Sequence, residues 1–162
     1  MTERHYPYVP RQANQLRAGE LWSIALEDGR YACGVVLDPV PLSPHNQEPM
    51  GNGLIVVGLM DWVGELTPTV DEIEPISRVL RQAYGAATTI SRDGGEIVGC
   101  RDLAANPVEL DEMVSHRGGG PVWILSAGRR VREATEKERV SLRILGGLGY
   151  SGFKPGAERH FR

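Results

Sequence analysis

Two histidines stand in segments that could carry acid–base chemistry. His45 lies in the Pro-rich segment 38–53, and His116 comes just before a glycine triplet. With Asp102 or Cys100, either histidine could form the His/Asp or Cys/His pair that activates a nucleophile. The spacing of these residues supports neither pair, and the chain has no G-x-S-x-G sequence of the kind that presents a nucleophilic serine. We therefore expect both histidines to be exposed loop residues.

The glycine triplet at residues 118–120 is a second candidate for chemistry, because exposed backbone amides can bind a phosphate. Pro121 follows the triplet, and a strand rather than a helix is predicted after it. The chain contains no G-x-x-x-x-G-K-[ST] sequence, which phosphate-binding loops use. We interpret the triplet as a flexible turn.

Cysteine usage and the first residues bear on cofactors and on the compartment. The chain has two cysteines, Cys33 and Cys100, with no CxxC sequence and no Cys/His cluster, so we expect no metal site and no other cofactor. Two thiols in a chain of this length suit a reducing compartment. The N-terminus is polar and lacks the apolar segment of a secretory signal, and no apolar run is long enough to span a bilayer. We expect a cytoplasmic protein without membrane contact.

The end of the chain is basic. Residues 129–162 hold nine Lys and Arg against four Asp and Glu, with Tyr150 and Phe153 among them. Basic and aromatic residues together can bind nucleic acid. The whole chain, however, has a pI of about 5.8, and its acidic middle opposes such binding. We interpret these charges as a solvated face and disfavour nucleic acid as a partner.

The middle of the chain is acidic, since residues 61–112 hold eleven Asp and Glu against four Lys and Arg. Such a surface can steer a basic partner to one face of a protein. A tryptophan flanked by acids is typical of a protein-binding hot spot, although it can also be a half-buried structural residue. The residues that we predict to bind a partner are Asp61, Trp62, Glu65, Asp71, Glu72 and Glu74.

The elements that must position these residues are mostly strands. The chain has 162 residues, which suits one domain, and its 20 Gly and 11 Pro favour turns and short strands over long helices. Residues 21–37 are predicted to form a hairpin around Asp28-Gly29, the sequence of a two-residue type I′ turn. That turn pairs Trp22 with Val35 and gives the hairpin one bulky face and one small face. The bulky face should enter the core, and the small face should let the sheet curl.

The remaining chain is predicted to alternate strands with connections. The Pro-rich segment 38–53 is expected to be a loop and residues 54–62 a strand that is buried on both faces. Pro75 can begin a helix whose apolar stripe ends at Gly85. Further expectations are a hairpin around 93–95, a short turn of helix at 109–114, a strand at 122–126 and a loose ending from residue 146. Residues 133–145 remain open between helix and strand, because a capping box and an alternating pattern compete there.

The stretch LRAGELWSIALEDGRYACGVVL, residues 16–37, resembles the start of the immunity protein 26 family of bacterial polymorphic toxin systems. That family begins with a Gly-acidic-apolar-aromatic strand, a short turn and a Y-x-x-G-x-V-L strand. The matching positions are Gly19, Glu20, Leu21, Trp22, Ile24, Leu26, Tyr31, Gly34, Val35 and Leu37. A later W-x-[apolar]-x-G element resembles WILSAG at Trp123, Ile124 and Gly128.

The segment GELWSIAL, residues 19–26, is also similar to the first strand of MazF/PemK-type toxin ribonucleases, which are small barrels. Those barrels place a long loop after this strand, whereas Asp28-Gly29 indicates a tight turn here. We interpret the likeness as a shared way to begin a curled sheet. A nuclease of this kind would depend on Arg30 or His45.

The immunity resemblance implies a cytosolic α+β protein without catalysis that binds a toxin and blocks it. We expect a mostly antiparallel, strongly curved, partly barrel-like sheet with one or two short helices. Residues 19–150 would form a single immunity-like domain, between an N-terminal tail or strap at 1–18 and a C-terminal tail at 151–162. The leading hypothesis is an immunity protein that occludes a cognate toxin. The alternatives are a small barrel-type nuclease and a nucleic-acid-binding adaptor that uses the basic C-terminal segment.

Overall fold

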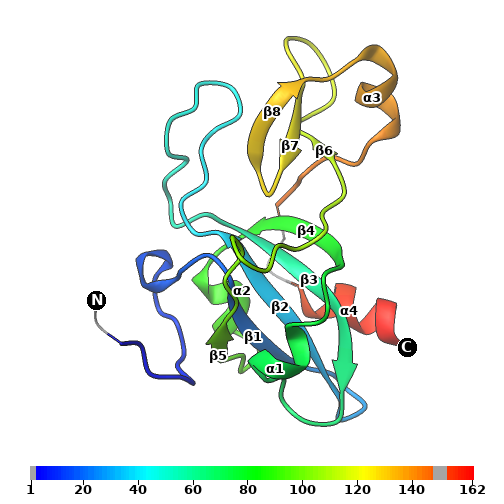
Figure 1. Cartoon of the computed structure of the whole chain (residues 1–162). Helices are drawn as coiled ribbons and strands as arrows, with labels where there is room; N and C mark the ends of the chain where they lie inside the picture. The colour runs from blue at the N-terminus through cyan, green and yellow to red at the C-terminus, as the bar shows by residue number, and fades with distance from the viewer. Residues whose placement is uncertain (1–2, 148–152) are drawn as a thin grey trace.

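A five-stranded antiparallel sheet forms the centre of the molecule (Figure 1). The computed structural model describes residues 3–147 and 153–162. The strand order is β4-β3-β2-β1-β5, so β4 and β5 are edges and the sheet does not close into a barrel. The strands are β1 (Glu20–Ala25), β2 (Tyr31–Asp38), β3 (Ile55–Gly64), β4 (Val79–Gly85) and β5 (Ile97–Cys100).

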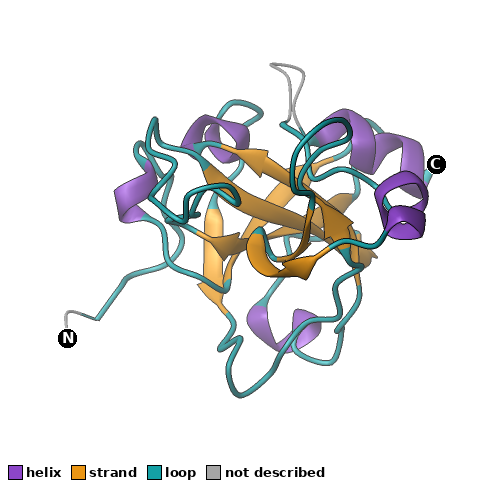
Figure 2. Cartoon of the chain, turned by 90° about the horizontal axis from the view of Figure 1, so that it is seen from above, coloured by secondary structure: helices purple, strands orange, loops and turns teal. Residues whose placement is uncertain are grey.

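Short helices surround this sheet, and from above the strands occupy the centre with the helices outside them (Figure 2). The described helices are the 3₁₀ turn η1 (Ala13–Gln15) and the α-helices α1 (Val70–Ile73), α2 (Ala87–Ser91), α3 (Glu136–Ser141) and α4 (Lys154–Phe161). None of them, within the ranges that the structure describes, has the length and apolar character needed to cross a membrane. The predicted α+β class with mostly antiparallel strands is confirmed.

The β1–β2 hairpin exists as predicted, but its register is shifted by one residue. Leu26 N donates to Arg30 O at 2.8 Å, Gly29 N donates to Leu26 O at 3.1 Å, and Gly29 has φ +87°. These features define a three-residue loop, in which a type I turn is followed by a left-handed glycine. Trp22 therefore faces Gly34 rather than Val35.

The shifted register abolishes the predicted division into a bulky and a small face. Trp22 lies directly over Gly34, where any Cβ would collide with the indole ring. A large residue is thus matched with the smallest one, and both faces of the hairpin are buried. The prediction that one small face would be left to let the sheet curl is wrong.

Two apolar clusters fill the opposite faces of the sheet. Trp22, Val57 and Phe153 belong to the cluster that α2 and α4 cover, and Leu21 and Met60 belong to the cluster that α1 covers. Residues 55–60 of β3 are buried throughout, as the prediction of a strand buried on both faces requires. Each fully buried aliphatic side chain of this kind contributes about 1.5–3 kcal/mol.

The predicted helix from Pro75 to Gly85 is wrong, because residues 79–85 form the edge strand β4. The expected apolar stripe was read from Ile76, Val79, Leu80 and Ala83. In the structure Leu59 pairs with Arg81 and Val57 pairs with Ala83. Pairing with a strand far along the chain thus overrides the local helical spacing.

Three further local predictions need correction. Residues 87–91 are helix α2, so only the second arm of the hairpin expected around 93–95 is a strand, which is β5. Met113–Val114 pair with a neighbouring strand as β6 and do not form a turn of helix. Residues 154–161 of the expected loose ending form α4, in which Ala157 is fully buried.

A smaller sheet with order β6-β7-β8 lies beside β4 and carries α3 (Figure 1). Its strands are β6 (Met113–Val114), β7 (Trp123–Ser126) and β8 (Arg129–Glu133). The predicted strand at 122–126 is confirmed as β7. Within the open segment 133–145, residues 136–141 form the helix α3, which begins with the capping box of Thr135 and Glu138. Ile144 instead pairs with Val114 in an isolated β-bridge.

Candidate partner-binding site

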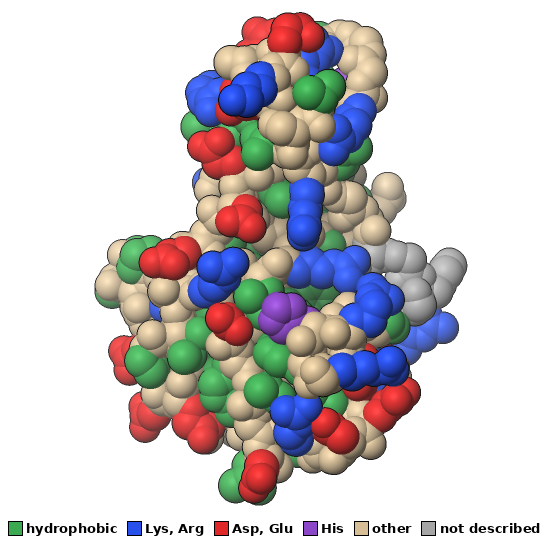
Figure 3. Space-filling view, turned by 90° about the vertical axis from the view of Figure 1, so that its right-hand side faces the viewer, with side chains coloured by type: hydrophobic (Ala, Val, Ile, Leu, Met, Phe, Trp, Pro, Cys, Tyr) green, Lys and Arg blue, Asp and Glu red, His purple; other side chains and the backbone are tan. Residues whose placement is uncertain are grey.

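The six predicted partner-binding residues lie on the end of β3, the turn after it and α1. We call the group Asp61, Trp62, Glu65, Asp71, Glu72 and Glu74 the acidic surface. All five acids are exposed, and Trp62 is half-buried. Acidic side chains gather at the lower left of the molecule in Figure 3. The group is thus placed where a second protein can reach it.

Helix α1 begins with a capping box that occupies one of these acids. Glu72 N donates to Thr69 Oγ1 at 3.3 Å, and Thr69 N donates to Glu72 Oε2 at 3.1 Å. Asp71 and Glu72 also lie in the first turn, where the helix dipole favours negative charge. Glu72 therefore stabilises α1, while Asp71 is left exposed to solvent.

A buried arginine holds the other end of α1. Arg101 is 3% exposed, and its guanidinium donates to the carbonyl oxygens of Ile73, Ile76 and Pro107. It also donates to the backbone and side-chain oxygens of Asn106, both at 2.9 Å. Burial lowers the pKa of Arg101, but a guanidinium keeps its proton in proteins. The positive charge is thus fixed beneath the acidic surface.

Asn106 completes this attachment, because its amide nitrogen donates to Glu74 O at 3.0 Å. Val70 packs against Gly99 of β5, which has no space for a side chain. Ile73 of the same helix is fully buried. The short helix is therefore held at several points, so the acids on it are presented by a rigid element.

Trp62 and Asp61 are not on the same face of β3. Trp62 packs against the apolar cluster that also contains Ile73, and its ring covers Gly64. Because side chains alternate along a strand, Asp61 points to the opposite face. Trp62 therefore lies on the face of the sheet that α1 covers, whereas Asp61 lies on the opposite face.

The five carboxylates of the acidic surface have one electrostatic feature in common. None of them forms an ion pair with any residue in 3–147 or 153–162. Like charges on neighbouring positions repel one another. The buried charge of Arg101 attracts Glu74 without forming an ion pair. The surface therefore holds negative charge that no described residue neutralises by an ion pair.

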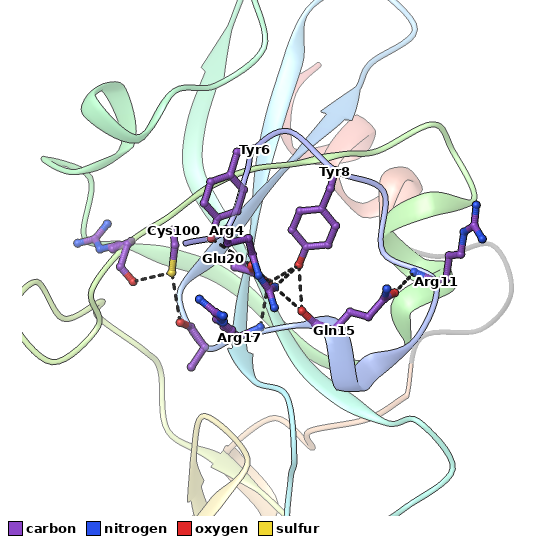
Figure 4. A network of polar contacts seen from close by, with 10 residues as sticks. Arg4, Tyr6, Tyr8, Arg11, Gln15, Arg17, Glu20 and Cys100 are labelled. Atoms are coloured by element: carbon purple, nitrogen blue, oxygen red, sulfur yellow. Dashed lines mark hydrogen bonds and ion pairs between the residues drawn. The ribbon is translucent and has the colours of Figure 1, made fainter. Parts of the chain in front are cut away.

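A second acidic group, which sequence reasoning missed, lies under the N-terminal segment (Figure 4). Glu20 at the start of β1 is fully buried. Its carboxylate accepts hydrogen bonds from Arg4 Nη1 at 2.6 Å, Tyr8 OH at 2.8 Å, Arg17 N at 2.8 Å and Tyr6 OH at 3.2 Å. The only signal in the sequence is an acid at the first position of an apolar strand. We call these residues the Glu20 network.

The Glu20 network suppresses ionisation of the groups around it. Burial raises the pKa of Tyr6 to about 12, and the negative charge of Glu20 acts in the same direction. Burial likewise raises the pKa of Tyr8 and that of the Cys100 thiol. A reactive cysteine needs a lowered pKa, so Cys100 is not set up as a nucleophile.

The two histidines predicted to be exposed loop residues lie close together, with His45 exposed and His116 half-buried. The ring centroids of His45 and His116 are 5.1 Å apart. His116 Nδ1 is 3.0 Å from Ser115 Oγ, and His116 Nε2 is 3.2 Å from Gly119 O. Neither Asp102 nor Cys100 contacts this pair. Within the described ranges no three His, Cys, Asp or Glu side chains are grouped so that they could hold a metal ion.

Arg30, one of the two residues on which the nuclease alternative depends, has a structural role. Its guanidinium forms an ion pair with Asp28 at 2.7 Å and donates to Phe161 O at 2.6 Å. It therefore fastens the β1–β2 loop to the end of α4. The sheet is also open rather than a barrel.

The adaptor alternative loses part of its free charge and one of its two aromatic residues. Arg132 pairs with Glu138 at 2.7 Å, and Arg130 lies over the Trp123 ring with its Cζ 4.3 Å from the centroid. Phe153 is 2% exposed in the core, so it cannot stack on a base. Tyr150 lies outside the described residues.

Comparison with known proteins gives one family. Residues 17–121, more than half of the chain, match the profile of the family described as Immunity protein 26. No curated protein and no solved structure matches the chain. The matched range includes β1 to β6 and the whole acidic surface. It also includes Arg17 and Glu20 of the Glu20 network, but not Arg4, Tyr6 or Tyr8.

Proposed function

Because the chain belongs to the immunity protein 26 family, we propose that it is a non-catalytic protein that neutralises a cognate toxin by binding and occluding it. The family match is the observation that carries this proposal. The partner is a toxin protein, and the protein acts in the cytoplasm without a cofactor. The reaction of the toxin is stopped because its active cleft is covered, so no catalytic group is needed on this chain.

The acidic surface is the proposed toxin-binding site. Its carboxylates lack ion-pair partners among the described residues, so they are available to the basic groups of a toxin cleft. Complementary charge accelerates encounter and excludes wrong partners. Half-buried Trp62 supplies an aromatic anchor next to these charges, and aromatic anchors dominate many protein interfaces.

Rigid presentation supports the same assignment. Arg101 and Asn106 hold the C-terminal end of α1, and the Thr69 capping box holds its N-terminal end. Side chains on a fixed element lose less conformational freedom on binding than those on a loose loop. The acids of α1 therefore begin close to the arrangement that a partner requires.

The proposal is tested by co-expression with the toxins that neighbouring genes encode. We expect one toxin to arrest growth when expressed alone and to be harmless with this protein, and the two purified proteins to form a stable complex. The purified protein alone should cleave neither RNA nor DNA. Protection without a complex, or nuclease activity that is lost in Arg30→Gln or His45→Gln, would contradict the proposal.

A further inference from the structure

A groove of about 460 Å³ lies between β4, α4 and residues 143–147. Figure 3 shows a hollow at this level, between the part of the molecule with the smaller sheet and the part with the main sheet, with basic side chains around it. A volume of this size is in the range of small-molecule sites. We call it the basic groove.

The floor of the basic groove is an uncovered section of the β4 edge. At one end of the strand Val79 N donates to Glu109 O, and at the other end Tyr84 N donates to Gly146 O. Chain segments thus cover β4 at both ends. Residues 80–83 line the groove between these two contacts.

Three arginines that form no ion pair with a described residue line the groove. Arg81, Arg143 and Arg159 line it together with His160 and a single acid, Asp111. None of the three guanidinium groups forms an ion pair with a residue in the described ranges. Guanidinium groups bind phosphate and carboxylate in a forked geometry.

Gln82 adds an unpartnered polar atom at the floor. It is 6% exposed, and its Nε2 donates to Asp111 O at 2.8 Å. Its Oε1 is buried and accepts no hydrogen bond from the described residues. A buried acceptor without a donor is unfavourable, so a ligand with an N–H or O–H group would relieve it.

The position of Arg81 depends on a glycine in α4. A Cβ at Gly156 would collide with Arg81 Nη1, so the guanidinium lies against the first turn of the helix where there is no side chain. Alanine is favoured over glycine inside a helix. Gly156 therefore makes α4 less stable than an alanine would, but it leaves space for the Arg81 guanidinium.

We propose that the basic groove binds a small oxyanion, a phosphate or carboxylate compound that also carries an N–H or O–H donor. The anion lies between the three guanidinium groups, and the donor meets Gln82 Oε1. This site is separate from the acidic surface and does not depend on the toxin. Oxyanion binding by the isolated protein can therefore be measured whether or not the protein binds a toxin.

Titration calorimetry on the full chain tests this with three probes. Sulfate is an anion without a donor, citrate is a carboxylate with a hydroxyl, and adenosine 5′-monophosphate is a phosphate ester with an amino group. We expect citrate or the nucleotide to bind more tightly than sulfate, and the tighter of the two identifies the anion. No saturable binding of any probe below about 10 mM overturns the proposal.

Variants separate this site from general attraction of anions. Arg81→Gln should weaken binding about tenfold, whereas the matched control Arg11→Gln, an exposed arginine that does not line the groove, should not. Gly156→Ala should weaken binding and raise the melting temperature, because it displaces the guanidinium while favouring the helix. Gln82→Leu should lower the affinity for citrate and for adenosine 5′-monophosphate to the affinity for sulfate. Equal losses in Arg81→Gln and Arg11→Gln would overturn the proposal.

Discussion

The molecule holds its carboxylates in two opposite ways. Glu20 is fully buried and accepts hydrogen bonds from Arg4, Tyr6, Tyr8 and Arg17. The five carboxylates of the acidic surface are exposed and have no ion-pair partner among the described residues. The first arrangement attaches the N-terminal segment to the sheet. In the second, the carboxylates remain available to interact with a binding partner.

The difference shows how a structural charge can be told from a binding charge. A charge can be buried only when its partners replace the water that it loses. An exposed charge among like charges contributes little to folding. Removing Glu20 should therefore affect stability, whereas removing acids from the acidic surface should affect partner binding.

The largest expected effect on stability is that of Glu20→Ala. It removes the buried carboxylate that accepts from Arg4 and the two tyrosines and leaves the charge of Arg4 without its ion-pair partner, so we expect a loss of about 3–5 kcal/mol in the free energy of unfolding. Urea denaturation measures it. Glu65→Ala is the control, with an expected change below about 0.5 kcal/mol. Similar losses in the two variants would break the distinction between the two groups.

Arg101→Met tests the support beneath the acidic surface. The substitution keeps an apolar stem but leaves the carbonyls of Ile76 and Pro107 without their donor, so we expect a loss of about 2–4 kcal/mol in the free energy of unfolding. Exposed Arg78→Met should change it by less than about 0.5 kcal/mol. If the two variants unfold at the same urea concentration, Arg101 does not hold α1.

Thr69→Ala should have a smaller effect on the same helix. It removes the side-chain acceptor for Glu72 N and should lower the free energy of unfolding by about 1 kcal/mol. Thr67→Ala, an exposed threonine outside the capping box, is the matched control. Hydrogen exchange of the α1 amides should be faster only in Thr69→Ala, and equal exchange would show that the cap is not needed.

The smallest expected effect is a loss of stability at alkaline pH. Tyrosine in the unfolded chain ionises near pH 10, whereas burial raises the pKa of Tyr6 to about 12 in the folded protein. The folded state therefore keeps a proton that the unfolded state loses, and stability falls as pH rises from about 10 to 12. Melting temperatures between pH 8 and 12 should fall less steeply in Tyr6→Phe. An identical slope would contradict this role for Tyr6.

Predictions from local patterns are confirmed where the pattern extends along one strand. The alternation in residues 21–37 and the apolar run in 54–62 correspond to β1, β2 and β3. The predicted loop of the hairpin was one residue too short, because Asp28-Gly29 also fits a three-residue loop in which a type I turn is followed by a left-handed glycine. In β4, pairing with β3 decided the structure against the local helical spacing.

Groups assembled from distant segments could not be predicted from spacing. Arg4 and Tyr8 reach Glu20 only because the N-terminal segment pairs with the edge strand β5, where Tyr8 lies opposite Ile97. Arg81 and Gly156 meet across two elements that sequence analysis did not identify. The acids of the acidic surface could be named because they are close in sequence, but their lack of partners is visible only in the structure.

The affinity of the acidic surface for the cognate toxin tests the central claim most directly. The variant Asp61→Lys/Glu65→Lys/Asp71→Lys reverses three acids and leaves intact the capping residue Glu72 and Glu74, which lies near the buried charge of Arg101. The matched control Glu48→Lys/Glu96→Lys/Glu133→Lys makes the same charge change at exposed positions elsewhere. We predict that the first variant keeps its melting temperature but binds the toxin about 100-fold more weakly, with little change in the control. Equal affinity of the two variants would contradict the assignment of the acidic surface as the toxin-binding site.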